Sequence, residues 1–382
     1  MFFVLKLSKL CNLRCTYCYE YDELGLTERM PIEGLRQFFA WLAEHQPAGG
    51  WPKLHFVFHG GEPLLLPHGY LRDIVHAQQL YLEPAGINFV NSLQTNLTRM
   101  DDATLALLDE LHMGLGVSLD VFGDQRVFLS GSLSQPIVLR NLQKLIDAGA
   151  VRRLGVGIIS VLHRNNIHRI LGTYEFCRTL GISYRVLPVF SIVAPPARMQ
   201  ELMLSHAEVV AALQKLAMRW LETGMEVNVF PLNNYLDAAI HSLLGVRANT
   251  YDPTQGDWAY IINTNGDTYS HAEAYSSAGW MGNIFEQPFL GILHSSAHDQ
   301  SLVPRIGRGE VCSRCRFSSA CSHIPLVESL PSERGTDTDG NVTCQIALPM
   351  IDFFCNQLAA DPDLKRMLQD GRSRSLADLA PA

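Results

Sequence analysis

The sequence predicts an α/β fold: a partial (β/α)6 TIM-like barrel followed by a small cysteine-rich α+β region. From residue 2 to about residue 190, apolar strand-like runs alternate six times with segments of helical periodicity. This alternation is typical of a parallel sheet covered by helices. Eight such units would close a full barrel, so six predict an open one. Four cysteines between residues 312 and 344 mark the second region.

Turn and capping residues define the predicted elements. Pro31 suits the first position of a helix, and Asp101 and Asp102 can cap the start of the third helix. Gly149 and Gly181 follow the fourth and fifth helices, where glycine commonly ends a helix. The predicted strands are 2–8, 54–59, 88–94, 114–120, 154–162 and 183–189. The predicted helices are 31–46, 68–82, 101–112, 136–149, 166–180 and 204–223.

Length and composition limit the class of protein. The chain has 382 residues, 47% of them hydrophobic, and a net charge of −8. Because the chain is acidic overall, it has no general positive potential that would attract nucleic acid. It contains no run of 18 apolar residues, so we predict no membrane span. The apolar start is too short for a signal peptide. We therefore expect a cytoplasmic protein whose nine cysteines serve metal or redox chemistry rather than disulfides.

The predicted domains are 1–230 for the barrel, 231–350 for the cysteine-rich region, and 351–382 for a C-terminal helix and tail. A chain of 382 residues suggests two domains. From residue 258 the alternation of strand-like and helical segments gives way to two strand-like runs that flank residues 263–266. The Asn-Gly pair there favours a tight hairpin turn.

Three cysteines follow the first strand in the order C-x3-C-x2-C. They are Cys11, Cys15 and Cys18, with the aromatic Tyr17 just before the third. Three thiolates on one loop can bind three irons of a [4Fe–4S] cluster, and full ligation takes four cysteines. The fourth iron is then open to a small molecule. A zinc loop or three unrelated buried thiols are the alternatives. Because the loop follows a strand, we expect it at the C-terminal face of the barrel.

This pattern resembles the signature of the radical S-adenosylmethionine (SAM) enzymes, over the whole predicted barrel. The resemblance implies that the amino and carboxylate groups of SAM chelate the open iron. It also implies that one electron from the cluster splits the sulfonium, and that the resulting 5′-deoxyadenosyl radical abstracts hydrogen from substrate.

The end of the second strand, His59-Gly60-Gly61-Glu62-Pro63, resembles the GGEP motif of the same family. In that family the motif binds the methionine amino group of SAM. Two glycines also permit an ordinary tight turn, which is the alternative. The expected SAM contacts here are Tyr17, Gly60, Gly61 and Glu62.

The resemblance places four further residues at the SAM site: Asn96, Ser118, Arg126 and Leu187. Ser118 and Arg126 would hold the ribose or the methionine carboxylate, for which a guanidinium fork is suited. A local salt bridge with Asp120 is the alternative for Arg126. Leu187 would lie against the adenine, with plain core packing as the alternative.

The late cysteines Cys312, Cys315, Cys321 and Cys344 have the spacing C-x2-C-x5-C with one distal cysteine. Together with the hairpin and a Gly-Asn-Ile step at 282–284, they resemble the SPASM domain over roughly 258–346. That resemblance implies one auxiliary [4Fe–4S] cluster, because a second set would need cysteines where His271 and Pro325 stand. Four cysteines also suit zinc, and His271 could be a ligand.

We therefore expect a radical SAM/SPASM peptide maturase that acts on a ribosomally made precursor peptide with an external one-electron donor of the flavodoxin or ferredoxin type. Intramolecular crosslinks are the expected products, with cyclophane-type carbon–carbon linkages favoured over thioethers. Only ten residues precede Cys11, so leader recognition falls to the C-terminal domain, the barrel rim or a separate protein. The sequence assigns no catalytic base.

Two other functions fit parts of the sequence. An anaerobic sulfatase-maturating enzyme, which forms formylglycine, would share both domains. It would carry the full cysteine set and an acidic residue directly after the hairpin cysteine, where this chain has Ala272 after His271. A catalytically inactive iron–sulfur scaffold that binds a peptide or a partner enzyme is the other alternative.

Overall fold

The computed structural model describes residues 1–189, 195–247, 259–270, 277–321, 334–336 and 342–360. One sheet of ten strands forms the centre of the fold, in the order β10-β9-β8-β1-β2-β3-β4-β5-β6-β7. Strands β1 to β7 run parallel to their neighbours in chain order. Their bounds are Phe2–Ser8, Leu54–Gly60, Phe89–Thr95, Gly114–Ser118, Gly157–Leu162, Ser183–Pro188 and Val229–Phe230. The partial α/β barrel predicted from the sequence is therefore confirmed.

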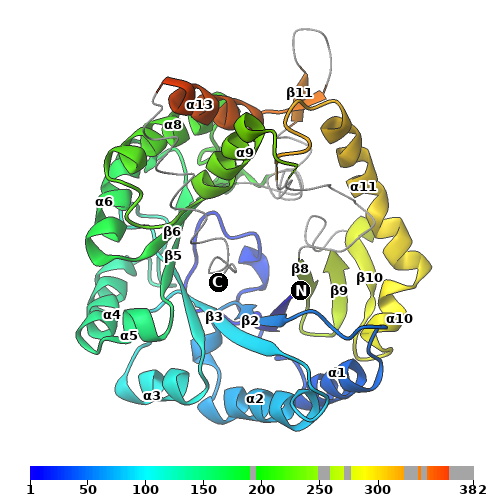
Figure 1. The fold of residues 1–382 in the computed structure, drawn as a ribbon. Coiled ribbons are helices and arrows are strands. Elements are labelled where there is room, and N and C mark those ends of the chain that lie inside the picture. Colours follow the sequence, from blue (N-terminus) through cyan, green and yellow to red (C-terminus); the bar gives the residue numbers. More distant parts are fainter. Residues whose placement is uncertain (190–194, 248–258, 271–276, 322–333, 337–341, 361–382) are drawn as a thin grey trace.

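Helices cover the outer face of this sheet, as the ring of ribbons in Figure 1 shows. The six predicted helices are α1 (Ile32–Glu44), α2 (His68–Leu82), α3 (Asp102–Glu110), α4 (Gln135–Asp147), α6 (Ile170–Leu180) and α8 (His206–Glu222). The sequence did not predict α5 (Ala150–Arg153), α7 (Ala197–Gln200), α9 (Leu232–Leu244), α10 (Phe289–Leu293) or α11 (Ser296–Ser313). Helix α13 (Ala347–Ala360) corresponds to the expected C-terminal helix.

Capping residues explain most of these helix ends. The Asp101 side chain accepts a hydrogen bond from the Thr104 amide at the start of α3. Gly149 and Gly181 take left-handed φ values of 62° and 64° after α4 and α6, which glycine adopts without strain. One predicted strand was too long at its start. The strand was predicted at 154–162, but residues 154 and 155 form a turn after α5, so β5 begins only at Gly157.

Burial alternates along the strands and separates the two faces of the sheet. In β2, Leu54, Phe56 and Phe58 are fully buried, and they belong to the main core between sheet and helices. The alternate residues His55 and His59 of the same strand are partly exposed. β4 and β5 show the same alternation, as expected when successive side chains point to opposite faces. The inner face of the open barrel therefore remains partly accessible.

The C-terminal hairpin extends the barrel sheet. β8 (Ala259–Ile262) pairs in parallel with β1, and β9 (Asp267–Ser270) and β10 (Trp280–Asn283) follow in antiparallel order. Gly266 has a φ of +89° in the predicted turn, and the Asn283 side chain donates to the Asn265 carbonyl across it. The sheet is thus continuous across residues 230 and 231, and the division into domains stays a prediction.

The last described helix, α13, packs against helices at the end of the barrel region. α13 packs against α9 and α8, and Figure 1 shows α13 and α9 side by side. Trp220 of α8 and Phe354 of α13 meet edge to face, with ring centroids 6.4 Å apart. Among the described residues, no helix combines the length and the apolar character that crossing a membrane requires.

Candidate functional site

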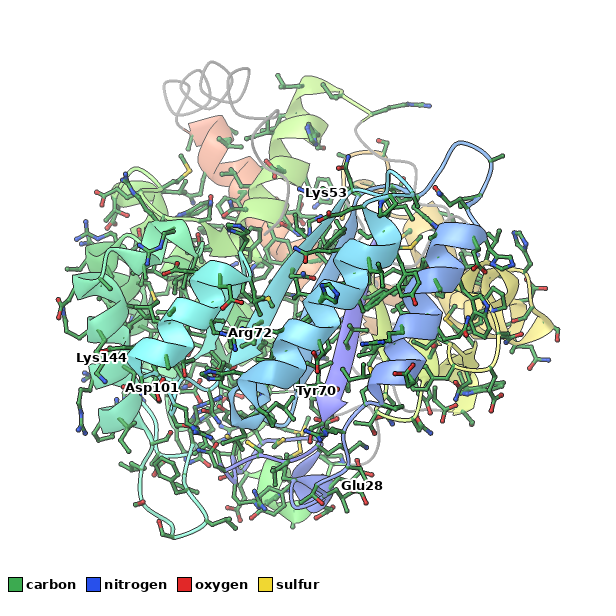
Figure 2. All side chains as sticks on the ribbon, turned by 90° about the horizontal axis from the view of Figure 1, so that it is seen from below. Glu28, Lys53, Tyr70, Arg72, Asp101 and Lys144 are labelled. Carbon is green, nitrogen blue, oxygen red and sulfur yellow. The ribbon has the colours of Figure 1, made fainter. Side chains whose placement is uncertain are left out.

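The three N-terminal cysteines lie at the carboxyl end of the sheet, as predicted. They follow β1 directly. Figure 2 views the strands from the side: Lys53, which precedes β2, lies near one end of the sheet, and Glu28, in the segment after the cysteines, lies near the other. Residues 11–18, called the Cys loop below, therefore occupy the end of the barrel where parallel α/β folds place their sites.

Residues that follow β4 hold the Cys loop in place through its backbone. The amides of Arg14 and Thr16 donate to the carbonyls of Val127 and Gln125, at 2.7 and 3.0 Å. The Cys11 amide donates to Leu24 at 3.0 Å, which folds the following segment back over the loop. The loop conformation thus depends on contacts more than 100 residues away in sequence.

The three thiols are neighbours in a buried environment. Burial raises the pKa of Cys11 to about 12, with Glu62 and the other two cysteines adding to the shift. Burial likewise raises the pKa of Cys18 to about 11, and that of Cys15. Thiols in this state favour protons over charge until a metal replaces the protons. Within the described parts of the chain, no three acidic, histidine or cysteine side chains converge on a single metal ion.

Gly60 and Gly61 allow the end of β2 to press against the backbone that enters the Cys loop. A Cβ on Gly60 would overlap the Ser8 carbonyl oxygen, and one on Gly61 would overlap that of Leu10. The Gly61 amide donates to the Ser8 carbonyl at 2.8 Å. The sequence analysis expected these glycines to expose backbone to a ligand. In the structure they give room to the protein backbone.

Glu62 joins the ends of β2 and β3. Its Oε1 accepts hydrogen bonds from the Leu64 amide at 2.9 Å and the Thr95 hydroxyl at 2.8 Å, and its Oε2 accepts from the Asn96 amide at 2.6 Å. Burial raises the pKa of Glu62, whereas these hydrogen bonds and Arg126 lower it. Each carboxylate oxygen has two lone pairs, so Oε2 retains room for one more donor.

The other predicted residues also lie at the carboxyl edge of the sheet. The side-chain Nδ2 of Asn96 donates to Asn12 Oδ1 in the Cys loop at 3.0 Å and lies 3.8 Å from the Cys11 sulfur. Ser118, the last residue of β4, accepts from Gln94 at 2.7 Å. Leu187 is half-buried near the end of β6. The strand ends thus bring together residues that are widely separated in sequence.

Tyr17 links Arg126 to Asp120. Its hydroxyl donates to Asp120 Oδ2 and accepts from Arg126 Nη1 at 2.9 Å. Asp120 Oδ1 accepts from the Val161 amide at 2.8 Å. Arg126 Nε is buried without a hydrogen-bond partner, and such an orphaned donor is costly. An anionic group such as a carboxylate would satisfy it.

The sequence analysis missed Lys6, a lysine within the first strand. It is 1% exposed; its ammonium donates to the Tyr19 hydroxyl and lies 3.3 Å from His59 Nδ1 and 3.5 Å from Glu20. Burial lowers the pKa of Lys6, but Glu20 and Tyr19 together raise it by more. The pKa of Lys6 is therefore above its ordinary value. A lone lysine among apolar strand residues is the signal that could have revealed this buried cation.

His163 was also missed. It directly follows β5 and is fully buried, and neither ring nitrogen has a hydrogen-bond partner. Burial lowers the pKa of its imidazole, against the opposing effect of Asp120 and Asp124. Its ring centroid lies 6.0 Å from that of Tyr17. A polar residue at the carboxyl end of a strand was the available signal in the sequence.

The four late cysteines gather near the end of α11. The Cys315 amide donates to Cys312 at 3.0 Å, and the Cys321 amide to Phe317 at 2.8 Å. Cys344 ends β12 (Val342–Cys344), which pairs with β11 (Arg334–Thr336). Burial raises the pKa of Cys312, and the other three cysteines raise it further. Charge on any of these three thiols would therefore be felt at Cys312.

Two further cysteines, Cys177 and Cys355, belong to neither cluster of thiols. Cys177 is fully buried in α6, as expected of a core thiol. Cys355 is half-buried on α13. His271 lies outside the described residues.

Replacing Glu62 with glutamine should lower the free energy of unfolding by about 1–3 kcal/mol, because the new amide NH2 leaves at least one buried donor without an acceptor. Denaturant unfolding measures this loss. Glu110→Gln is the control, since the Glu110–Arg72 ion pair is half-exposed on the surface, and it should leave stability almost unchanged. Equal effects of the two substitutions would contradict the structural role assigned to Glu62.

Comparisons with known proteins identify several relatives. The chain is 37% identical over 110 residues to the serine-type anaerobic sulfatase-maturating enzyme of Klebsiella aerogenes, across 29% of this chain and 27% of that enzyme. It is 24% identical over 418 residues to the enzyme of the same name from Bacteroides thetaiotaomicron, across 96% and 95%. It is 32% identical over 186 residues to the PqqA peptide cyclase of Methylorubrum populi, across 46% and 42%. The match thus spans about a quarter of the Klebsiella enzyme.

A solved structure matches the fold of this chain, and a family model matches part of its sequence. The solved structure of anSMEcpe with bound AdoMet and the Cp18Cys peptide superposes with a TM-score of 0.75 at 17% identity, covering 97% of this chain and 98% of that one, and so has the same fold. Residues 5–177, which include the Cys loop and the strands β2 to β5, match the radical SAM superfamily. Residues 5–177 therefore form a radical SAM domain.

Proposed function

We propose that this protein is a radical SAM maturase that joins two residues of a ribosomally made precursor peptide through an intramolecular crosslink, with a cyclophane-type carbon–carbon bond rather than a thioether. The observation that carries the proposal is the Cys loop, with one buried and two half-buried thiols grouped at the carboxyl end of an open barrel. The relation to a peptide cyclase and the fold shared with the peptide-bound anSMEcpe structure support a peptide substrate.

In this proposal the residues of the Cys loop hold the SAM-binding [4Fe–4S] cluster through Cys11, Cys15 and Cys18. When bound, the cluster and SAM supply the 5′-deoxyadenosyl radical that takes hydrogen from the substrate. The orphaned Nε of Arg126 suits the carboxylate of the methionine moiety, and the remaining lone pair on Glu62 Oε2 suits its ammonium group. Both positions fit the cofactor without disturbing the hydrogen bonds already made.

The remaining SAM contacts follow from position. Tyr17, Asn96, Ser118 and Leu187 would surround the adenosine and the amino acid moiety, whereas Gly60 and Gly61 support the site by letting the backbone approach the Cys loop. The partly exposed inner face of the sheet would position the reacting carbon of the peptide. Holding reactants in place is the main contribution of a protein whose cofactor supplies the radical chemistry.

The C-terminal cysteines Cys312, Cys315, Cys321 and Cys344 would bind one auxiliary [4Fe–4S] cluster. Four protein ligands close its coordination shell, so its role would be electron transfer or stabilisation of the region 231–350. An external one-electron donor of the flavodoxin or ferredoxin type would reduce the enzyme. A separate protein, the barrel rim or the C-terminal region would recognise the leader peptide.

Formylglycine formation on a sulfatase is the second candidate. It is favoured by the 24% identity that extends over 96% of this chain to a sulfatase-maturating enzyme. The two candidates share the radical step and differ in the product. Identifying the peptide that reacts and its product therefore distinguishes the two candidates.

Cys18→Ala should abolish production of 5′-deoxyadenosine in anaerobic incubations with dithionite and SAM, because one iron ligand of the SAM-binding cluster is lost. Chromatography of the nucleoside products measures this. Cys355→Ala, which changes a half-buried thiol of α13, should retain wild-type production. A wild-type protein that forms no 5′-deoxyadenosine would support the inactive scaffold instead.

The product of the peptide reaction should lose two hydrogens and resist fragmentation between the two joined residues. Short precursor peptides encoded beside the gene are the substrates to test, by tandem mass spectrometry. A sulfatase peptide containing cysteine or serine is the comparison. Formylglycine carries an aldehyde that a hydrazine reagent captures, so a captured product would favour sulfatase maturation and exclude the crosslink.

Reconstituted protein should contain about eight irons per chain, four for each of two clusters. Cys344→Ala should disrupt the auxiliary cluster and lower the content towards about four irons. Iron determination with Mössbauer spectroscopy tests both numbers. Zinc in place of iron, or an auxiliary cluster unaltered in Cys344→Ala, would contradict the assignment.

A further inference from the structure

The segment that follows β6 returns to the Cys loop. Arg198, on the short helix α7, donates from Nη2 to the carbonyl oxygen of Cys18 at 3.1 Å. Its guanidinium carbon lies 4.4 Å from the centroid of the Tyr21 ring, a distance at which a cation is attracted to an aromatic face. A residue 180 positions away in sequence thus contacts the third cysteine of the loop.

Packing fixes this segment in place. Met199 and Leu202 are 2% and 4% exposed and form a small core with Val189, against which Tyr17 packs. The Arg164 amide, after β5, donates to the Leu202 carbonyl at 3.0 Å. The Arg164 side chain also pairs with Glu208 at 2.9 Å. The position of Arg198 beside Cys18 is therefore determined by contacts on both sides of α7.

The charge of Arg198 is not balanced by a nearby carboxylate. Among the residues that the structure describes, Arg198 forms no ion pair, and its Nε is buried without a hydrogen-bond partner. Lys6, another cation near the loop, pairs with Glu20 at 3.5 Å. Arg126 also keeps an orphaned Nε, but it is linked through Tyr17 to the carboxylate of Asp120. Arg198 therefore adds positive charge next to the Cys18 end of the loop.

Reduction of an iron–sulfur cluster adds one electron, and nearby charge and hydrogen bonds set its reduction potential. A cation in a partly buried site stabilises the added negative charge more than it would in water. We propose that Arg198 is a positioning residue that fixes the Cys18 end of the loop and raises the reduction potential of the cluster held there. This inference rests on the proposed function, because it assumes that the Cys loop binds the SAM cluster.

The test is a potentiometric titration of the reconstituted full-length protein without SAM, followed by electron paramagnetic resonance of the reduced Cys-loop cluster. Arg198→Gln should lower the ratio of reduced to oxidised cluster at the wild-type midpoint at least tenfold, which is about 59 mV for a one-electron couple. Arg198→Lys keeps the charge and should recover most of the wild-type potential.

Arg164→Gln is the matched control, because it loosens the same segment but removes no charge beside Cys18. It should leave the potential at the wild-type value. A potential that is unchanged in Arg198→Gln would overturn the inference. So would a shift in Arg164→Gln equal to that in Arg198→Gln, since loosening alone would then explain it.

If the Arg198→Gln protein does not assemble a cluster, a second variant tests the same inference. Tyr21→Leu removes the ring against which the guanidinium lies but leaves the charge on the chain. It should shift the potential in the same direction by a smaller amount, and an unchanged potential would overturn the inference. A wild-type protein that binds no cluster at the Cys loop would instead overturn the proposed function itself.

Discussion

The close approach of two backbone segments is the constraint on which the rest of the site depends. The turn after β2 contacts the residues that lead from β1 into the Cys loop, and side chains at Gly60 and Gly61 would prevent it. The same turn places Glu62 where it accepts hydrogen bonds from the end of β3. One backbone contact thus fixes the loop, the buried carboxylate and the third strand end relative to one another.

The Cys loop is held by contacts from several other segments as well as by hydrogen bonds within the loop. The segment after β4 pairs with its backbone, Asn96 contacts it from β3, and Arg198 contacts it from the segment after β6. Each contact comes from residues that follow a strand at the carboxyl edge of the sheet. A parallel sheet brings these ends together, which explains how residues throughout the barrel act on one short loop.

Burial gives the site its electrostatic character. Cys11, Glu62 and Lys6 are buried, and Cys15, Cys18 and Arg126 are half-buried. Away from water, an isolated charge is costly unless it is paired or hydrogen-bonded. Lys6 and Glu62 have partners, whereas Arg126 and Arg198 each keep a buried donor without one. These orphaned donors lie beside the cysteines, where the proposed iron–sulfur cluster and the carboxylate of SAM would bind.

Six strands and six helices of the barrel could be predicted from the sequence alone, because their apolar periodicity and the capping residues Asp101, Gly149 and Gly181 are local signals. The short elements β7, α5 and α7 lack such signals and were missed. The sequence also determined the C-x3-C-x2-C spacing, since three thiols within eight residues are restricted to one loop. Only the tertiary structure decided that β8 joins β1, that Tyr17 bridges Arg126 and Asp120, and that Arg198 reaches Cys18. These contacts join residues far apart in sequence, and no local pattern encodes which strand ends and loops will meet once the sheet curves.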